Sequence, residues 1–73
     1  MYEKIIEIVA EHLDTTVEEI SRDSKFEDLG IDSLDAVELV MKLEEGLDIQ
    51  LDLDRELQTI DDLVKFVEEK SAE

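Results

Sequence analysis

The fold is decided by residues 26–45, which read FEDLGIDSLDAVELVMKLEE. The apolar residues in the second half of this stretch recur with the spacing of an amphipathic α-helix. Asp32 followed three residues later by Asp35 is a capping arrangement, and carboxylates are favoured at a helix N-terminus. The helix is therefore predicted to begin at Asp32 or Ser33 and to continue to about Glu45.

Two elements are predicted on the N-terminal side of this helix. Residues 2–13 carry apolar side chains at helical spacing and predict a first helix. Thr16 followed by Glu19 is a capping-box pattern, so a single helical turn is predicted there, with Val17 and Ile20 as its apolar anchors. The remaining residues before the second helix are predicted to form a long ordered loop.

On the C-terminal side, Gly46 is predicted to be the left-handed residue that ends the second helix. Residues 47–57 are predicted to be an extended loop with at most a short helical turn. Thr59 followed by Asp62 predicts the cap of a last helix. The fold class is therefore all-α. We expect a single domain over residues 1–73, a small bundle of three principal helices with a long loop between the first and second and a short or irregular third element.

Composition excludes several classes of function. The 73 residues include 23 acidic and 7 basic side chains, which give a net charge of −16, and there is no cysteine. Such a charge repels nucleic acid, and disulfides and thiolate metal sites are impossible. The sequence shows no apolar run long enough to span a bilayer and no basic-then-apolar signal segment. A cytoplasmic monomer without membrane association is therefore expected. His12, the only histidine, is expected to be an exposed helical residue, and catalysis is not expected.

The second helix carries two apolar stripes, which is one more than a small bundle needs. One stripe is suited to the core and includes Leu39 and Leu43. The other is formed by Leu34, Val37 and Met41, and acidic residues surround it. An exposed apolar strip that is surrounded by negatively charged residues predicts a docking surface for basic partners. The acidic positions of this predicted docking face are Asp35, Glu38, Glu44 and Glu45.

Residues 26–45 closely resemble the core motif of the acyl carrier proteins of the free-standing bacterial type. Length, acidity and helix layout extend the resemblance over nearly the whole chain. The resemblance implies that Ser33 carries 4′-phosphopantetheine, which a Mg²⁺-dependent phosphopantetheinyl transferase attaches from coenzyme A. Asp32 is then the acidic neighbour that assists recognition by the transferase, and Leu34 completes the Asp-Ser-Leu motif. The arm ends in a thiol that holds acyl groups as thioesters, which fits a chain without cysteine.

The resemblance also implies a carrier with no catalytic activity of its own. It would present acyl chains to fatty-acid synthesis enzymes, whose basic patches would dock on the face of the second helix described above. Weak divalent-cation binding to clustered carboxylates is expected, without a specific metal site. The residues predicted to form the core or to line an acyl cavity are Ile5, Val9, Phe26, Ala36, Val40, Leu43, Ile60 and Val64.

Two alternatives remain open at the level of sequence. Residues 46–57 depart from the family pattern, because no proline follows the second helix and the segment is short. The chain could therefore be a carrier for a specialised polyketide, peptidyl or other acyl pathway. The other alternative is an unmodified acidic helical adaptor, in which Ser33 only caps its helix. Attachment of 4′-phosphopantetheine to Ser33 distinguishes a carrier, of either pathway, from an unmodified adaptor.

Overall fold

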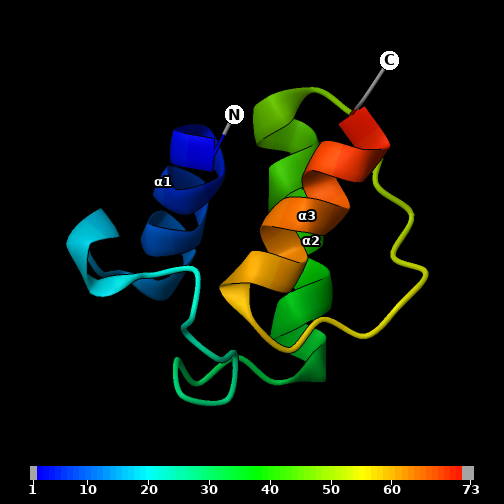
Figure 1. The fold of residues 1–73 in the computed structure, drawn as a ribbon. Coiled ribbons are helices and arrows are strands. Elements are labelled where there is room, and N and C mark those ends of the chain that lie inside the picture. The colour runs from blue at the N-terminus through cyan, green and yellow to red at the C-terminus, as the bar shows by residue number, and fades with distance from the viewer. Residues whose placement is uncertain (1, 72–73) are drawn as a thin grey trace.

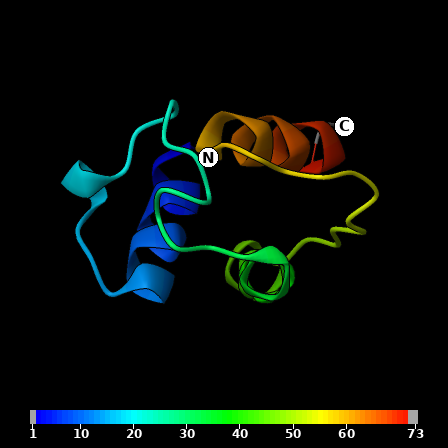
Figure 2. The ribbon, with the colours of Figure 1, turned by 90° about the horizontal axis from the view of Figure 1, so that it is seen from below.

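The computed structural model describes residues 2–71. Its elements are α1 (Tyr2–Leu13), the 3₁₀ turn η1 (Val17–Glu19), α2 (Ser33–Leu47) and α3 (Ile60–Ser71). Helix α1 runs opposite to α2, whereas α3 runs in the same direction as α2 (Figure 1). Residues 14–32 cross one end of the bundle, and residues 48–59 return along its outside (Figures 1 and 2). The predicted all-α class, the three principal helices and the long first loop are confirmed.

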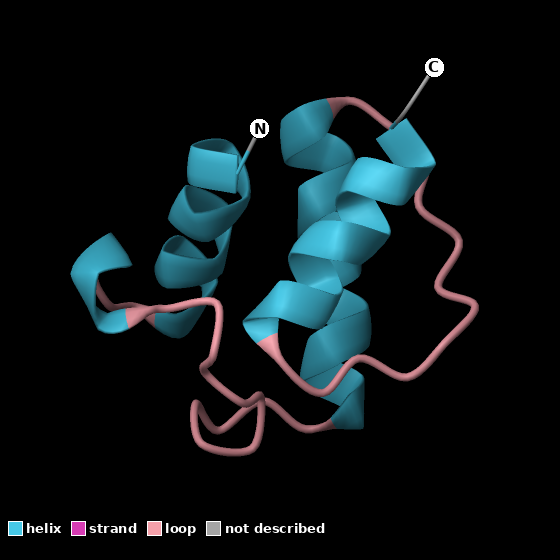
Figure 3. Ribbon diagram, in the orientation of Figure 1, coloured by secondary structure: helices cyan, strands magenta, loops and turns pink. Residues whose placement is uncertain are grey.

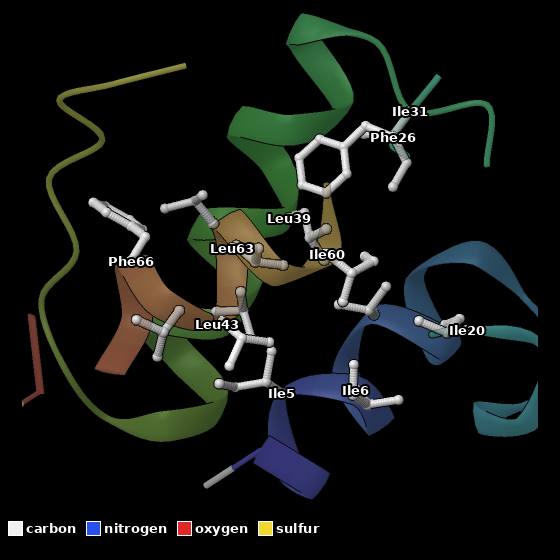
Figure 4. Packing of buried hydrophobic residues seen from close by; sticks show 14 of the residues in the cluster. Ile5, Ile6, Ile20, Phe26, Ile31, Leu39, Leu43, Ile60, Leu63 and Phe66 are labelled. Atoms are coloured by element: carbon white, nitrogen blue, oxygen red, sulfur yellow. The ribbon is translucent and has the colours of Figure 1, made fainter. Parts of the chain in front are cut away.

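A single hydrophobic cluster holds the three helices together (Figure 4). Its largest fully buried side chains include Phe66, Leu39 and Ile5, so each α-helix contributes to it. Burial of such side chains is the main stabilising contribution in a domain this small. All predicted core residues are buried except Ala36, which is half-buried and lines a cavity described below.

The predicted caps of α2 and α3 are confirmed. Asp32 Oδ1 accepts a hydrogen bond of 2.9 Å from the backbone N–H of Asp35, so Asp32 is the N-cap and Ser33 is the first helical residue. At the start of α3, Thr59 Oγ1 accepts from the N–H of Asp62 (3.1 Å), and Asp62 Oδ2 accepts from the N–H of Thr59 (3.3 Å). This reciprocal pair satisfies two backbone donors that the helix itself leaves without partners.

The predicted capping box of η1 is wrong in its side chains. Thr16 is the N-cap residue, but its hydroxyl makes no capping hydrogen bond. The turn is closed by the backbone instead, because the N–H of Glu19 donates to the carbonyl of Thr16 (3.1 Å). Of the two predicted anchors, Ile20 is buried and Val17 is exposed.

Helix α2 does not stop at Gly46, contrary to the prediction. The helix ends at Leu47, and Asp48 takes the left-handed conformation (φ 54°) while its N–H donates to the carbonyl of Glu44. Gly46 lies inside the helix opposite α1, where a Cβ atom would be 2.6 Å from Cδ1 of Ile8. Its small size therefore serves the close approach of two helices, and no turn depends on it.

Residues 48–59 contain no helix (Figure 3). Leu51 is buried, and Glu44 Oε2 accepts a hydrogen bond of 3.0 Å from its backbone N–H. These contacts attach residues 48–59, called the returning segment below, to α2. The third element of the predicted fold, residues 48–59, is thus irregular, which is one of the two forms expected from the sequence. None of the helices among residues 2–71 combines the length and the apolar character needed to cross a membrane.

Backbone pairing joins the long first loop to the start of α3. Lys25 and Thr59 form an isolated antiparallel bridge. The N–H of Phe26 donates to the carbonyl of Gln58 (2.8 Å), and the N–H of Ile60 donates to the carbonyl of Ser24 (2.9 Å). Because this loop leads directly into α2, the pairing fixes the N-terminus of α2 relative to α3.

Charged side chains hold the returning segment against α3. Arg55 donates to both carboxylate oxygens of Glu69, at 3.0 and 2.8 Å, and to Asp54 at 2.9 Å. Lys70 also donates to Asp54, at 3.0 Å. The hydrogen bond from Arg55, followed by that from Lys70, lowers the pKa of Asp54 from its ordinary value of 3.8 to about 2.

We expect Lys70→Met to raise the pKa of Asp54 toward 3.8, measured by NMR titration of the side-chain carboxyl carbon. Because the pKa of Asp54 is lowered by folding, its contribution to stability is present above pH 3.8 and is lost as the pH falls toward 2. Lys65→Met is the control, since Lys65 pairs with Asp61. Equal pKa values of Asp54 in both variants would show that the Lys70 pair does not form in solution.

Candidate functional site

Ser33 presents a free hydroxyl at the first residue of α2. The residue is exposed, and its Oγ takes part in no hydrogen bond within residues 2–71. Asp32 supplies the cap of the helix, so the hydroxyl of Ser33 is not needed for that purpose. The interpretation of Ser33 as a helix cap is therefore wrong.

The backbone around Ser33 favours an anion. The first N–H groups of an α-helix have no partners inside the helix, and the helix dipole adds partial positive charge there. Only the N–H of Asp35 receives a side-chain acceptor, from Asp32. Gly30, in the loop that leads into α2, has a φ of 77°, a backbone conformation that glycine adopts without strain. A phosphate group on Ser33 would thus lie where helices commonly bind phosphate.

An open cavity of about 530 Å³ lies beside Ser33, between the start of α2 and residues 53–59. Ala36, Val37 and Leu57 are among its apolar lining residues, and Lys25 and Arg55 are cations that also line it. Neither Lys25 nor residues 53–59 were identified as site residues from the sequence. Their position depends on the loop pairing with α3, and no local motif signals that pairing.

The second apolar stripe of α2 is exposed, as predicted. Leu34 is 77% exposed and Met41 is 57% exposed, and Val37 is also at the surface. The four acidic positions of the predicted docking face differ in exposure. Glu38 and Glu45 are exposed, Asp35 and Glu44 are half-buried, and one oxygen of Glu44 is already occupied by the N–H of Leu51.

Charge is compensated unevenly over the molecule. All ion pairs among the described residues involve α3 or the returning segment, as in the pairs Arg22–Asp61 (2.7 Å) and Arg55–Glu69 (2.8 Å). These pairs lower the pKa of Asp61 and of Glu69 through hydrogen bonds from their arginines. No side chain of α2 takes part in such a pair, so the carboxylates of α2 keep their full charge for a partner.

His12 is half-buried, which corrects the expectation of an exposed residue. Its Nδ1 atom is fully buried and has no hydrogen-bond partner in the part of the chain that the structure describes. The helical spacing placed His12 in α1 correctly but did not show that its ring reaches α2.

These features define a small carrier domain. It has a free, exposed serine hydroxyl at a helix N-terminus, a cavity beside that hydroxyl and an acidic face without ion pairs on the same helix.

Comparison with known proteins agrees with this class. The sequence profile described as "Phosphopantetheine attachment site" matches residues 3–67. The acyl carrier protein of Caulobacter vibrioides is 48% identical over 73 aligned residues, which cover 96% of this chain and 94% of that protein. The acyl carrier proteins of Streptococcus pyogenes and Streptococcus pneumoniae are 41% and 38% identical over 71 residues, 97% of this chain and 96% of each relative. The chain belongs to the acyl carrier protein family, and it is a carrier with a phosphopantetheine attachment site and no catalytic activity of its own.

Proposed function

We propose that Ser33 is the residue that carries 4′-phosphopantetheine and that the protein presents acyl groups to fatty-acid synthesis enzymes. The observation that carries this proposal is the free, exposed hydroxyl of Ser33 at the first residue of α2, beside a cavity of about 530 Å³. Ser33 also lies inside the matched residues 3–67.

The residues around Ser33 fit the chemistry of this group. The N-terminus of α2 would favour its phosphate, and the apolar lining at Val37 and Leu57 would contact the arm or the first carbons of an acyl chain. When attached, the group supplies a thiol that holds acyl groups as thioesters. The chain itself has no cysteine for that purpose.

The partners in this proposal are a phosphopantetheinyl transferase and synthesis enzymes that carry basic docking patches. The uncompensated carboxylates of α2 would steer such patches, and the exposed Leu34, Val37 and Met41 would supply apolar contact once the partners meet. Asp32, next to the modified serine, would be within the transferase footprint. A monomeric protein in the cytoplasm, where these enzymes would meet it, is part of the same proposal.

The test is to load the wild-type protein and then locate the modification. The protein is incubated with coenzyme A, Mg²⁺ and a broad-specificity transferase, digested, and analysed by mass spectrometry. We expect one phosphopantetheinyl group on the peptide that contains Ser33, and none on the peptides with Ser21, Ser24 or Ser71. Modification elsewhere would overturn the assignment of Ser33. No modification of a folded protein would favour the acidic adaptor.

A specialised acyl pathway is the second candidate, and the segment 48–59 favours it. This segment has no helix, and it places Arg55 and Glu56 in the lining of the cavity beside Ser33. Charged lining residues would select acyl groups with polar substituents over plain hydrocarbon chains. Comparing the rates at which synthesis enzymes accept hydroxylated and saturated acyl groups from the loaded carrier would distinguish the two pathways.

Charge reversal on the docking face is expected to slow loading. Glu38→Lys should reduce kcat/KM of the transferase for this carrier by roughly 3- to 10-fold at low salt, because it removes steering charge at an exposed position. The thermal midpoint should change little, since Glu38 makes no ion pair within residues 2–71.

Glu68→Lys is the matched control, with the same charge change at an exposed position on α3. It should leave kcat/KM near the wild-type value. Equal losses in both variants would mean that total charge, rather than the face of α2, governs docking.

A further inference from the structure

Three potential metal ligands meet where α1 ends and α2 begins. One nitrogen of His12 and one carboxylate oxygen each of Asp35 and Glu38 lie within 4.8 Å of one another. The antiparallel course of the two helices brings the last turn of α1 beside the first turns of α2 (Figure 1). Asp35 and Glu38 are three positions apart, so their side chains are neighbours on one side of α2.

The hydrogen-bonding groups of these three side chains are not paired with one another. No hydrogen bond or ion pair joins His12 to either carboxylate within residues 2–71, although salt bridges elsewhere in the same range are as short as 2.7 Å. Nδ1 of His12 is buried without a partner. A buried polar atom without a hydrogen bond is unusual in a folded protein and calls for an explanation such as an ion.

The chemistry of the three ligands selects a class of metal. Imidazole suits Zn²⁺ and other transition metals, whereas Ca²⁺ and Mg²⁺ prefer sets made of oxygen ligands alone. Around a tetrahedral zinc ion with ligand distances of about 2.0–2.1 Å, ligand atoms lie roughly 3.3 Å apart. Side-chain rotations of the order of an ångström would therefore bring these atoms to coordinating distance.

An ion can reach the site from the surface. His12 also lines an open groove of about 460 Å³ between α1 and α2. Three carboxylates line this groove, those of Glu7, Glu11 and Glu45, and they outnumber its two cations, Lys4 and Lys42, so the groove would attract a cation. Glu38 is itself exposed, so the third ligand is accessible from solvent.

We propose that His12, Asp35 and Glu38 form a binding site for one Zn²⁺ ion, which connects the end of α1 to the start of α2. The site depends on an imidazole, and this separates it from weak binding of Ca²⁺ or Mg²⁺ to surface carboxylates. Bound Zn²⁺ would also neutralise Asp35 and Glu38 and so compete with basic partners. That consequence rests on the proposed function, whereas the site itself does not.

The test is calorimetric titration of the unmodified 73-residue protein with Zn²⁺ in millimolar Mg²⁺, which fills weak carboxylate sites. We expect one Zn²⁺ per chain for the wild type. His12→Gln and Glu38→Gln should each weaken binding by at least roughly 10- to 100-fold, because even the loss of a residue that only hydrogen-bonds to a metal ligand costs that much in other sites. Glu68→Gln is the matched control, with the same charge change at an exposed position on α3 outside both the three ligands and the groove, and should bind like the wild type.

A second readout uses the wild-type protein alone and does not depend on the folding of any variant. His12 is the only histidine, so its ring resonances in an NMR spectrum are unambiguous. They should shift with stoichiometric Zn²⁺ and stay in place with Mg²⁺. Unmoved ring resonances, or a His12→Gln variant that binds Zn²⁺ as tightly as the wild type, would overturn the zinc site. Because no transferase or partner is used, either result leaves the proposed function untouched.

Discussion

Ser33→Ala is expected to reduce phosphopantetheinyl loading to the limit of detection, measured by intact mass after incubation with coenzyme A, Mg²⁺ and a transferase. The reason is chemical, because alanine has no hydroxyl to form the bond to phosphorus. Other hydroxyls do not replace it. None of the remaining serines lies at the first residue of a long helix beside the cavity, and the hydroxyl of Thr59, which also lines the cavity, is occupied in capping α3.

The substitution is expected to leave the fold intact, which makes the loss of loading interpretable. Asp32, rather than Ser33, caps α2 through its bond to the N–H of Asp35. Ser33 is exposed, and alanine is a good helix former, so the free energy of unfolding should change by less than about 0.5 kcal/mol.

Ser71→Ala is the control for this experiment. Ser71 lies at the far end of α3 and donates to the carbonyl of Glu68 at 3.4 Å. This variant should load like the wild type. Residual loading of a folded Ser33→Ala protein would assign the attachment to another residue, and the interpretation of the α2 N-terminus would then fail.

The features that the sequence predicted correctly are local ones. Asp32 with Asp35, and Thr59 with Asp62, are capping pairs three residues apart, so their hydrogen bonds depend on little beyond the first turn of each helix. The exposed stripe on α2 follows from the 3.6-residue period once the other stripe is assigned to the core.

The features that were missed depend on contacts between elements distant in the sequence. The sequence predicts a helix stop at Gly46, whereas Gly46 accommodates Ile8 of another helix. Lys25 and residues 53–59 line the cavity only because the first loop pairs with the start of α3. The ring of His12 meets carboxylates of α2 for a similar reason, the antiparallel packing of two helices. Periodicity assigns faces to a helix, but it does not say which neighbour each face meets.

Leu39→Ala should destabilise the domain by about 2–5 kcal/mol, because Leu39 is fully buried and its truncation leaves a cavity. A domain of this size is stable by only about 5–10 kcal/mol, and its net charge of −16 adds self-repulsion. We therefore expect the thermal midpoint, followed by circular dichroism, to fall by roughly 10–30 °C.

Leu34→Ala is the matched comparison, since it makes the same chemical change on the same helix at a side chain that is 77% exposed. Its thermal midpoint should stay within a few degrees of the wild type, because almost no apolar surface returns to water. Its loading by the transferase should fall instead, because Leu34 is next to Ser33 on the proposed docking face. The two leucines thus separate stability from recognition on one helix. A Leu34→Ala protein that melts as early as Leu39→Ala would place Leu34 in the core, and the exposed apolar stripe would then lose its role as a docking surface.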